Sequence, residues 1–234
     1  MISIVLATYN ERQLIETTIT ALLKDAPEEM EIIVVDDDSP DNTWHVAQSL
    51  DLPQVKVIRR RGTRGLASAF NRGIIESRGN YVGWMDADMG MPPSMIPPMY
   101  RMIVDEGYDV VIGSRYAPGG VDDRARLRTL ASRAVNRFAG LVLGHGIRDY
   151  DSGFVLMRRS VLDSVSIIPV GYGEYFIEFI YNACHKGLKV GEIGYHFRDR
   201  SQGVSKSAPS LLRFLRTGFW YGVRILRARV RRID

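Results

Sequence analysis

The chain has 234 residues, of which 45% are hydrophobic and 25% charged, and 31 Lys and Arg against 27 Asp and Glu give a formal net charge of +4. These ordinary globular values exclude a disordered or fibrous chain. A single cysteine, Cys184, excludes an intrachain disulfide, and four scattered histidines leave no zinc-site spacing. We expect no signal peptide and no transmembrane domain, because no apolar run approaches the roughly 20 residues that span a bilayer.

Short apolar runs alternate with helix-like segments through the first half of the chain. We expect strands at residues 2–7, 31–35, 55–59, 81–85 and 108–113, and helices at residues 10–23, 39–50, 66–77 and 92–104. The first helix has a capping pattern that starts at Asn10. Strands separated by helices of this length predict parallel β-α-β crossovers, and so an α/β sheet with helices on both faces. Ligands of such sheets bind beyond the carboxyl ends of the strands.

The second half is less regular and ends in an arginine-rich segment. We expect helices at residues 124–143, 173–185 and 211–232, and strands at residues 152–158 and 190–198. No linker or repeat divides the chain, so we expect one catalytic domain over residues 1–210. Residues 211–234 then form a basic amphipathic helix appended to it. The apolar face of this helix favours two alternatives, contact with an anionic membrane surface or packing on the domain core.

Carboxylates follow two of the predicted strands. Asp86 and Asp88 have a spacing at which both can face one hard divalent cation, whose shell substrate phosphates and water usually complete. Such a pair also occurs in ordinary solvated loops, so the prediction of a metal site depends on its position after a buried strand. A second cluster, residues 36–38, predicts hydrogen bonds to a base or ribose, or else a helix N-terminal cluster stabilised by the helix dipole.

Seven short motifs occur in order along the chain. They are residues 7–11 (ATYNE), 35–43 (VDDDSPDNT), 65–71 (GLASAFN), 85–88 (MDAD), 113–116 (GSRY), 151–154 (DSGF) and 200–206 (RSQGVSK). Together they resemble a family 2 glycosyltransferase of the GT-A fold, and most closely the dolichol-phosphate mannose synthases. Each motif is weak alone, and the resemblance rests on their order and spacing over nearly the whole chain.

The resemblance implies an inverting transfer of a sugar onto a polyprenyl or dolichyl phosphate, with GDP-mannose as the preferred donor and Mg²⁺ or Mn²⁺ as cofactor. It also implies a membrane-surface partner, no nucleic acid, and a peripheral place on the cytoplasmic face of a membrane. UDP-glucose is the alternative donor. Two other functions stay open, a soluble transferase that acts on a protein or glycan and a sugar-nucleotide-binding subunit without catalysis.

The resemblance also implies roles for individual residues. Donor nucleotide positions are Ala7, Tyr9, Glu11, Val35, Asp36, Asp37, Asp86 and Ala87, and the metal ligands are Asp86 and Asp88. Acceptor phosphate positions are Arg115, Arg128 and Ser132, with Arg133 adjacent, although a solvated helix face is the favoured alternative for Arg133. Catalytic positions are Asp88, Arg115, Arg200 and Lys206, and residues 199–207 are expected to close over the donor diphosphate. Glu178 matches an acidic position on a helix.

Two positions depart from the family pattern. Ala7 stands where the family usually has Pro, and Gly90 stands where many relatives carry Gln, a third side-chain contact to the metal. The paired carboxylates are intact, so metal binding is still expected, with an affinity and donor preference that can differ from the family's. The acceptor phosphate is anionic near neutral pH, so the transfer needs no general base. It needs stabilisation of the charge on the leaving diphosphate.

Overall fold

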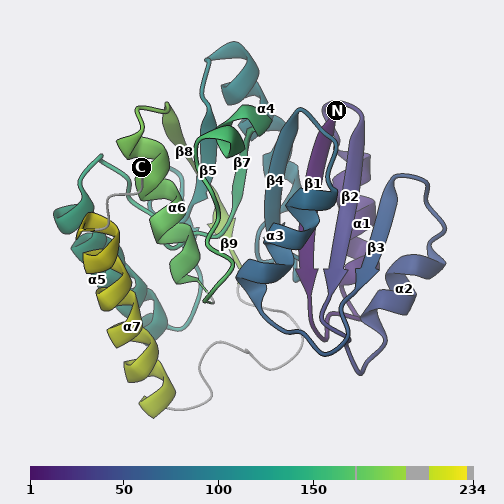
Figure 1. Ribbon diagram of the computed structural model, residues 1–234, viewed down its shortest axis with the longest axis horizontal. Helices are drawn as coiled ribbons and strands as arrows, with labels where there is room; N and C mark the ends of the chain where they lie inside the picture. Colours follow the sequence, from purple (N-terminus) through teal and green to yellow (C-terminus); the bar gives the residue numbers. More distant parts are fainter. Residues whose placement is uncertain (172, 199–210, 231–234) are drawn as a thin grey trace.

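A seven-stranded sheet of order β3-β2-β1-β4-β7-β5-β8 forms the centre of the computed structural model, which describes residues 1–171, 173–198 and 211–230 (Figure 1). Its strands are β1 (Ile2–Thr8), β2 (Met30–Asp36), β3 (Val55–Arg59), β4 (Tyr81–Asp86), β5 (Val110–Ser114), β7 (Val155–Arg158) and β8 (Val190–Gly194). All neighbouring strands are parallel except β7, which is antiparallel to both β4 and β5. The mostly parallel α/β sheet predicted from the sequence is confirmed.

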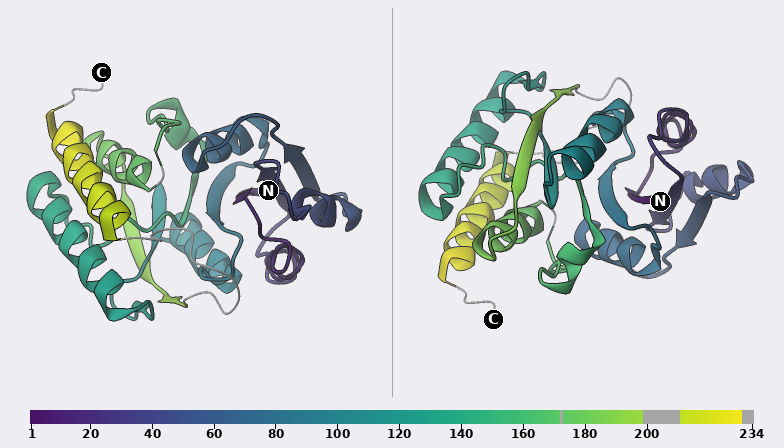
Figure 2. Two further views of the ribbon diagram at one scale, coloured as in Figure 1. Left: turned by 90° about the horizontal axis from the view of Figure 1, so that it is seen from below. Right: turned by 90° about the horizontal axis from the view of Figure 1, so that it is seen from above.

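Alternating side chains along the strands divide the interior into two hydrophobic cores. Ile4 and Leu6 of β1 belong to one core and Val5 to the other. The first core is covered by α1 (Ile15–Lys24), α2 (Thr43–Ser49) and α4 (Ile96–Asp105), and the second by α3 (Leu66–Glu76), α5 (Arg126–Leu143), α6 (Glu174–His185) and α7 (Leu211–Val230) (Figure 2). Because helices cover both faces, the central strands are apolar on both, which explains their continuous apolar runs.

Three helices of the first half begin later than the sequence predicts, and α4 does so because a 3-10 turn over Pro93–Met95 precedes it. The capping pattern predicts a start at Asn10, but α1 begins at Ile15, because Asn10 has a left-handed backbone and its N–H donates to Ser39 Oγ at 3.0 Å. The predicted start at Ser39 is also wrong. Helix α2 begins at Thr43, whose N–H donates to Asp41 Oδ1 at 3.0 Å. The Glu11 N–H also donates to the Thr43 hydroxyl at 2.9 Å, so the loops that follow β1 and β2 contact each other where both segments stay outside the helices.

The strand predicted over residues 190–198 is two strands in two sheets. After β8 the chain bends, and β9 (His196–Phe197) pairs instead with β6 (Val121–Asp122). The backbone N–H of Tyr195 donates to the carbonyl of Ser114 at 3.1 Å, where β8 leaves the large sheet. Gly194 is required there, because a Cβ would lie 2.2 Å from the carbonyl oxygen of Pro118. The close approach of the loop that contains Pro118 ends the strand, and the sequence alone does not predict that approach.

The described side chains of α7 face in two directions. Ile225 and Ala228 are buried in the second core, whereas Trp220 and Leu226 are exposed. The helix lies beside α5 and α6 in all three views (Figures 1 and 2). Over residues 220–230, packing on the core therefore accounts for Ile225 and Ala228 and leaves Trp220 and Leu226 exposed. Among the helices of residues 1–171, 173–198 and 211–230, none is long and apolar enough to cross a bilayer.

Candidate active site

Strand register brings three motifs to one edge of the sheet. In the paired strands, Thr8 of β1 lies opposite Asp36 of β2, and Ala7 lies opposite both Val35 of β2 and Asp86 of β4. All of these residues stand at the carboxyl ends of parallel strands, where α/β sheets bind ligands. The structure therefore places together residues predicted to bind the donor, which the sequence separates by almost the whole first half of the chain.

The carboxylate of Asp36 is fully buried and holds this edge together. Its Oδ2 atom accepts hydrogen bonds from the hydroxyls of Thr8 at 2.7 Å and Ser39 at 2.6 Å, and its Oδ1 accepts one from the Ser39 N–H at 2.8 Å. These bonds satisfy a buried charge that would otherwise be costly. Asp36 thus fixes the loop after β2 against β1.

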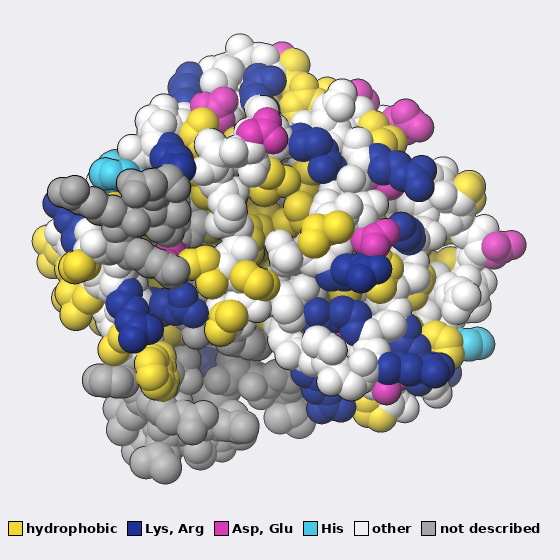
Figure 3. Space-filling model, in the orientation of Figure 1, with side chains coloured by type: hydrophobic (Ala, Val, Ile, Leu, Met, Phe, Trp, Pro, Cys, Tyr) yellow, Lys and Arg dark blue, Asp and Glu magenta, His cyan; other side chains and the backbone are white. Residues whose placement is uncertain are grey.

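Asp37 binds a different segment, the loop between β3 and α3. Its carboxylate forms an ion pair with Arg60, with 2.5 Å between Oδ1 and Nη2, and accepts the Gly65 N–H at 2.8 Å. The guanidinium of Arg64 lies 4.4 Å from the ring centre of Tyr9. The sequence prediction did not include Arg60 or Arg64. The signal was present in the basic run of residues 59–64 directly after β3, and Figure 3 shows Lys and Arg side chains gathered at the lower right, where β2 and β3 end.

Asp86 and Asp88 lie at and just beyond the end of β4. Asp86 is half-buried, and Asp88 is buried, with Oδ1 accepting the Gly90 N–H at 3.0 Å. Thr18 of α1 donates to the carbonyl of Ala87 at 3.1 Å, which fixes the turn between the two carboxylates. In the described part of the chain, no three His, Cys, Asp or Glu side chains form a group that could hold a metal. Two hard carboxylates fit Mg²⁺ or Mn²⁺ where substrate phosphates and water supply the other ligands.

Gly90 has a packing reason to lack a side chain. A Cβ there would lie 3.0 Å from Asp88 Oδ1, 3.2 Å from the carbonyl oxygen of Arg198 and 3.2 Å from the Phe197 ring. Arg198 also donates its N–H to the carbonyl of Gly90 at 3.4 Å. The chain that leads into the predicted lid therefore starts beside Asp88. The lid itself, with Arg200 and Lys206, lies outside the described residues.

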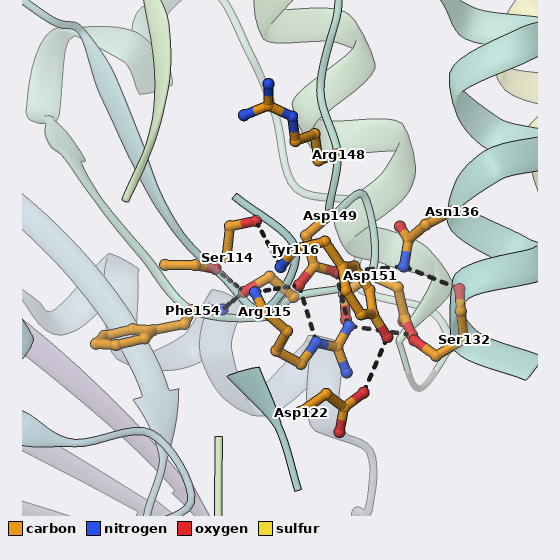
Figure 4. A network of polar contacts seen from close by, with 12 residues as sticks. Ser114, Arg115, Tyr116, Asp122, Ser132, Asn136, Arg148, Asp149, Asp151 and Phe154 are labelled. Carbon is orange, nitrogen blue, oxygen red and sulfur yellow. Dashed lines mark hydrogen bonds and ion pairs between the residues drawn. The ribbon is translucent and has the colours of Figure 1, made fainter. Parts of the chain in front are cut away.

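Arg115 lies just after β5 at the centre of a buried ionic network (Figure 4). Its Nε and Nη2 atoms donate to the two oxygens of Asp149 at 2.8 and 2.7 Å, and Nη2 also donates to the carbonyl of Asp151 at 2.8 Å. Asp149 is 0% exposed. Burial acts to lower the pKa of Arg115, but the charge and hydrogen bonds of Asp149 outweigh it and hold the pKa well above its ordinary value. Arg115 is therefore a fixed cation.

The other two predicted acceptor residues belong to α5. Ser132 is buried, and its carbonyl accepts a bond at 3.1 Å from Asn136, whose amide also donates to Asp149 at 3.3 Å. Asn136 thus connects Ser132 to the Arg115 network. Arg128, half-buried, lies one helical turn before Ser132.

A second ionic pair, absent from the sequence prediction, adjoins this network. Arg124 donates to both oxygens of Asp122 at 2.8 and 2.7 Å, and the Tyr116 hydroxyl donates to Asp122 at 2.9 Å. Burial acts to raise the pKa of Asp122, but the bonds and charge of Arg124 outweigh it and lower the pKa to about 2. An Arg at the first position of a predicted basic helix gives no sequence signal for such a pair.

Phe197 is the point at which the carboxylate edge and the arginine network meet. The guanidinium centres of Arg124 and Arg115 lie 5.3 and 6.0 Å from the centre of its ring. The same ring lies against Gly90 in the turn that carries Asp88. An acidic edge and fixed cations therefore face a common region, as a reaction between a metal-bound diphosphate and a second anion requires.

The fold and this carboxylate edge place the protein in the class with the GT-A glycosyltransferase fold. The structure superimposes on glucosyl-3-phosphoglycerate synthase from Mycobacterium tuberculosis in complex with UDP, with a TM-score of 0.74 and 19% identity over 100% of this chain and 82% of that one. The same enzyme in complex with Mg²⁺ and UDP gives a TM-score of 0.73. This likeness concerns the fold.

The family follows from the sequence comparison. Residues 3–166 match the family model for glycosyl transferase family 2, and the chain belongs to that family. It is 38% identical over 211 residues to a dolichol-phosphate mannosyltransferase of Pyrococcus furiosus, covering 88% of this chain and 58% of that protein. It is 32% identical over 219 residues to a polyprenol monophosphomannose synthase of Mycolicibacterium smegmatis, covering 90% and 82%. The chain thus spans little more than half the length of the Pyrococcus protein.

Proposed function

We propose that the protein transfers mannose from GDP-mannose to the phosphate of a polyprenyl or dolichyl lipid. The observation that carries this proposal is the meeting, across Phe197, of the Asp86 and Asp88 edge with the cations around Arg115. The names of the two sequence relatives supply the sugar and the class of acceptor. UDP-glucose is the second candidate donor, because the protein of like fold is known in complex with it.

The donor is proposed to bind at the carboxyl ends of β1, β2 and β4. Tyr9, with Arg64 against its ring, and Glu11 are proposed to contact the nucleotide. Ala7, Val35, Asp36, Asp37 and Ala87 are proposed to form the adjoining wall. Asp86 and Asp88 would hold Mg²⁺ or Mn²⁺, which when bound neutralises charge on the leaving diphosphate. Arg200 and Lys206 are proposed to add positive charge from the segment after Arg198.

The acceptor phosphate is proposed to bind to Arg115, Arg128 and Ser132. Asp149 orients the guanidinium of Arg115, so its direction is set before a ligand arrives. An acceptor phosphate oxygen forms the new bond to the anomeric carbon. The bond from that carbon to the donor diphosphate breaks, and its electron pair leaves with the diphosphate. Attack opposite the leaving group inverts the anomeric centre, and no proton needs to be removed from the anionic acceptor.

A lipid acceptor makes membrane contact part of the proposal. The exposed Trp220, Leu226, Arg227 and Arg229 of α7 combine aromatic, apolar and cationic side chains, as helices at a lipid interface do. We therefore propose a peripheral association with the cytoplasmic face of a membrane.

A panel of labelled nucleotide sugars tests the function directly. The protein is incubated with GDP-mannose, UDP-glucose or another donor, with Mg²⁺ or Mn²⁺ and a polyprenyl phosphate, and the product is extracted into organic solvent. We expect labelled lipid from GDP-mannose, and none when the free polyprenol replaces its phosphate. Transfer from UDP-glucose alone would replace the donor assignment. Nucleotide binding without transfer from any donor would favour a binding subunit.

A further inference from the structure

A pocket with a volume of about 570 Å³ opens beside α5, next to Arg115 of the proposed acceptor site. Its walls come from the segment after β5, from α5 and from the loop that leads to Asp149. The polar side chains that line it are those of Arg115, Tyr116, Arg133, Asn136, Arg137 and Arg148. Four of these six are arginines, and neither Asp nor Glu is among the lining residues. The pocket is therefore strongly cationic.

The charge of one of these arginines is neutralised within the protein, and that of the other three is not. Arg115 is paired with Asp149. In the part of the chain that the structure describes, no carboxylate forms an ion pair with Arg133, Arg137 or Arg148. Three cations that face one pocket without a counter-charge raise the local potential and attract an anion.

Contacts hold part of the pocket wall in place, although the side chains of Arg133, Arg137 and Arg148 are exposed. The guanidinium centres of Arg115 and Arg133 lie 5.4 and 5.7 Å from the centre of the Tyr116 ring. Asp122 holds the Tyr116 hydroxyl. The backbone N–H of Arg148 donates to Glu192 at 2.9 Å, which fixes the third wall, and in Figure 4 the Arg148 side chain stands apart from the Arg115 network.

We propose that this pocket binds a phosphate group, as a phosphomonoester or phosphodiester, through Arg133, Arg137 and Arg148. Guanidinium groups present paired N–H donors that match phosphate oxygens, which makes arginine suited to this ligand. The pocket adjoins the proposed acceptor site and shares Arg115 with it, but Arg128 and Ser132 do not line it. Arg137 and Arg148 have no part in the proposed transfer, so the inference goes beyond the proposed function.

Two sources could supply the phosphate, a free phosphorylated solute or the headgroup of an anionic lipid. Leu130 and Leu141, also on α5, are 63% and 85% exposed. A lipid bilayer would cover such side chains, whereas a free solute would not. The experiment therefore has one arm for each source.

The first arm titrates inorganic phosphate into the protein by calorimetry at constant ionic strength. The test variant is Arg137→Gln/Arg148→Gln, since the structure gives neither side chain an ion pair within the described residues. The matched control, Arg78→Gln/Arg101→Gln, removes two exposed arginines that do not line the pocket. We expect binding at least about tenfold weaker in the test variant, which corresponds to about 1.4 kcal/mol, and unchanged in the control. Circular dichroism verifies that both fold, and Arg148→Lys provides a milder variant.

The second arm measures sedimentation of the same proteins with phosphatidylcholine vesicles that contain or lack phosphatidylglycerol. If the test variant, but not the control, loses binding of inorganic phosphate, the pocket is a site for a free phosphate. Unchanged phosphate binding with a selective loss of binding to the anionic vesicles identifies a lipid headgroup. If the test variant matches the control in both arms, the pocket is not a phosphate site and the proposal is overturned.

Discussion

The two sides of the candidate active site hold their charged residues by different physical means. On the proposed donor side, Asp36 and Asp86 stand at strand ends, and the register of parallel strands places them. On the proposed acceptor side, Arg115 is held by Asp149, a residue 34 positions later in the chain, in a pair buried from water. A charge at a strand end needs only the sheet to form. A buried pair needs both partners, because either charge alone would be left desolvated.

The largest expected effect is on the buried pair. Asp149→Ala removes the nearer of two carboxylates paired with the buried Arg115 and leaves only Asp151, at 3.7 Å. It should lower the free energy of unfolding by about 3–5 kcal/mol, measured by urea denaturation. Replacing both partners, as in Arg115→Met/Asp149→Leu, should recover much of that loss. The control Asp123→Ala removes an exposed carboxylate that contacts His196 and should change little. A similarly small loss for Asp149→Ala would mean that the pair does not hold Arg115.

The donor side should respond in activity rather than in stability. Asp88→Asn should lower the transfer rate by about 10²–10³-fold, the size of effect when one group that stabilises developing charge is removed. The unfolding midpoint should stay close to that of the wild type, and EDTA should inactivate the wild type reversibly. Asp105→Asn, which changes an exposed carboxylate at the end of α4, is the matched control. Full activity in chelator with metal-free protein would exclude the metal assignment.

A variant at Arg128 tests the contrast between the buried Arg115 and the half-buried Arg128 of the proposed acceptor site. Arg128→Ala should raise the KM for the lipid phosphate or lower kcat by an amount equivalent to about 1.5–3 kcal/mol, as expected for a charge-assisted contact with phosphate. Unlike Asp149→Ala, it should not destabilise the fold strongly, because Arg128 is only half-buried. Nucleotide affinity by calorimetry should be unchanged. Loss of nucleotide affinity with normal lipid kinetics would mean that the donor and acceptor sites are exchanged.

The smallest expected effect concerns α7, in which one arginine is paired with a buried carboxylate and two others are exposed. Arg224 forms an ion pair with the buried Glu178 at 2.8 Å, whereas Arg227 and Arg229 are exposed. Arg227→Gln/Arg229→Gln should weaken sedimentation with anionic vesicles by about 1 kcal/mol per arginine, without loss of stability. Arg224→Gln should instead lower the unfolding midpoint, because it leaves Glu178 without this partner. If Arg227→Gln/Arg229→Gln binds the vesicles as well as the wild type does, the membrane contact lies elsewhere.

The sequence by itself determined the alternation of strands and helices and the acidic edge at Asp86 and Asp88. Both depend on local pattern, because a strand covered on both faces is apolar throughout and ends where polar residues begin. The same local patterns failed at Asn10 and at residues 190–198, where contacts with distant loops ended or delayed the element. The motifs carried the family assignment, whereas the roles of individual site residues stay proposals.

Only the tertiary structure decided the partners of the charged residues. It paired Arg115 with Asp149, Arg224 with Glu178 and Asp37 with Arg60. It also gathered Arg137 and Arg148 around one pocket with no carboxylate among its lining residues. The reason is that a carboxylate or guanidinium has the same appearance in a sequence whether water or an opposite charge surrounds it. That choice is made by long-range packing, which sets distance and burial, and these determine the energy of a charge.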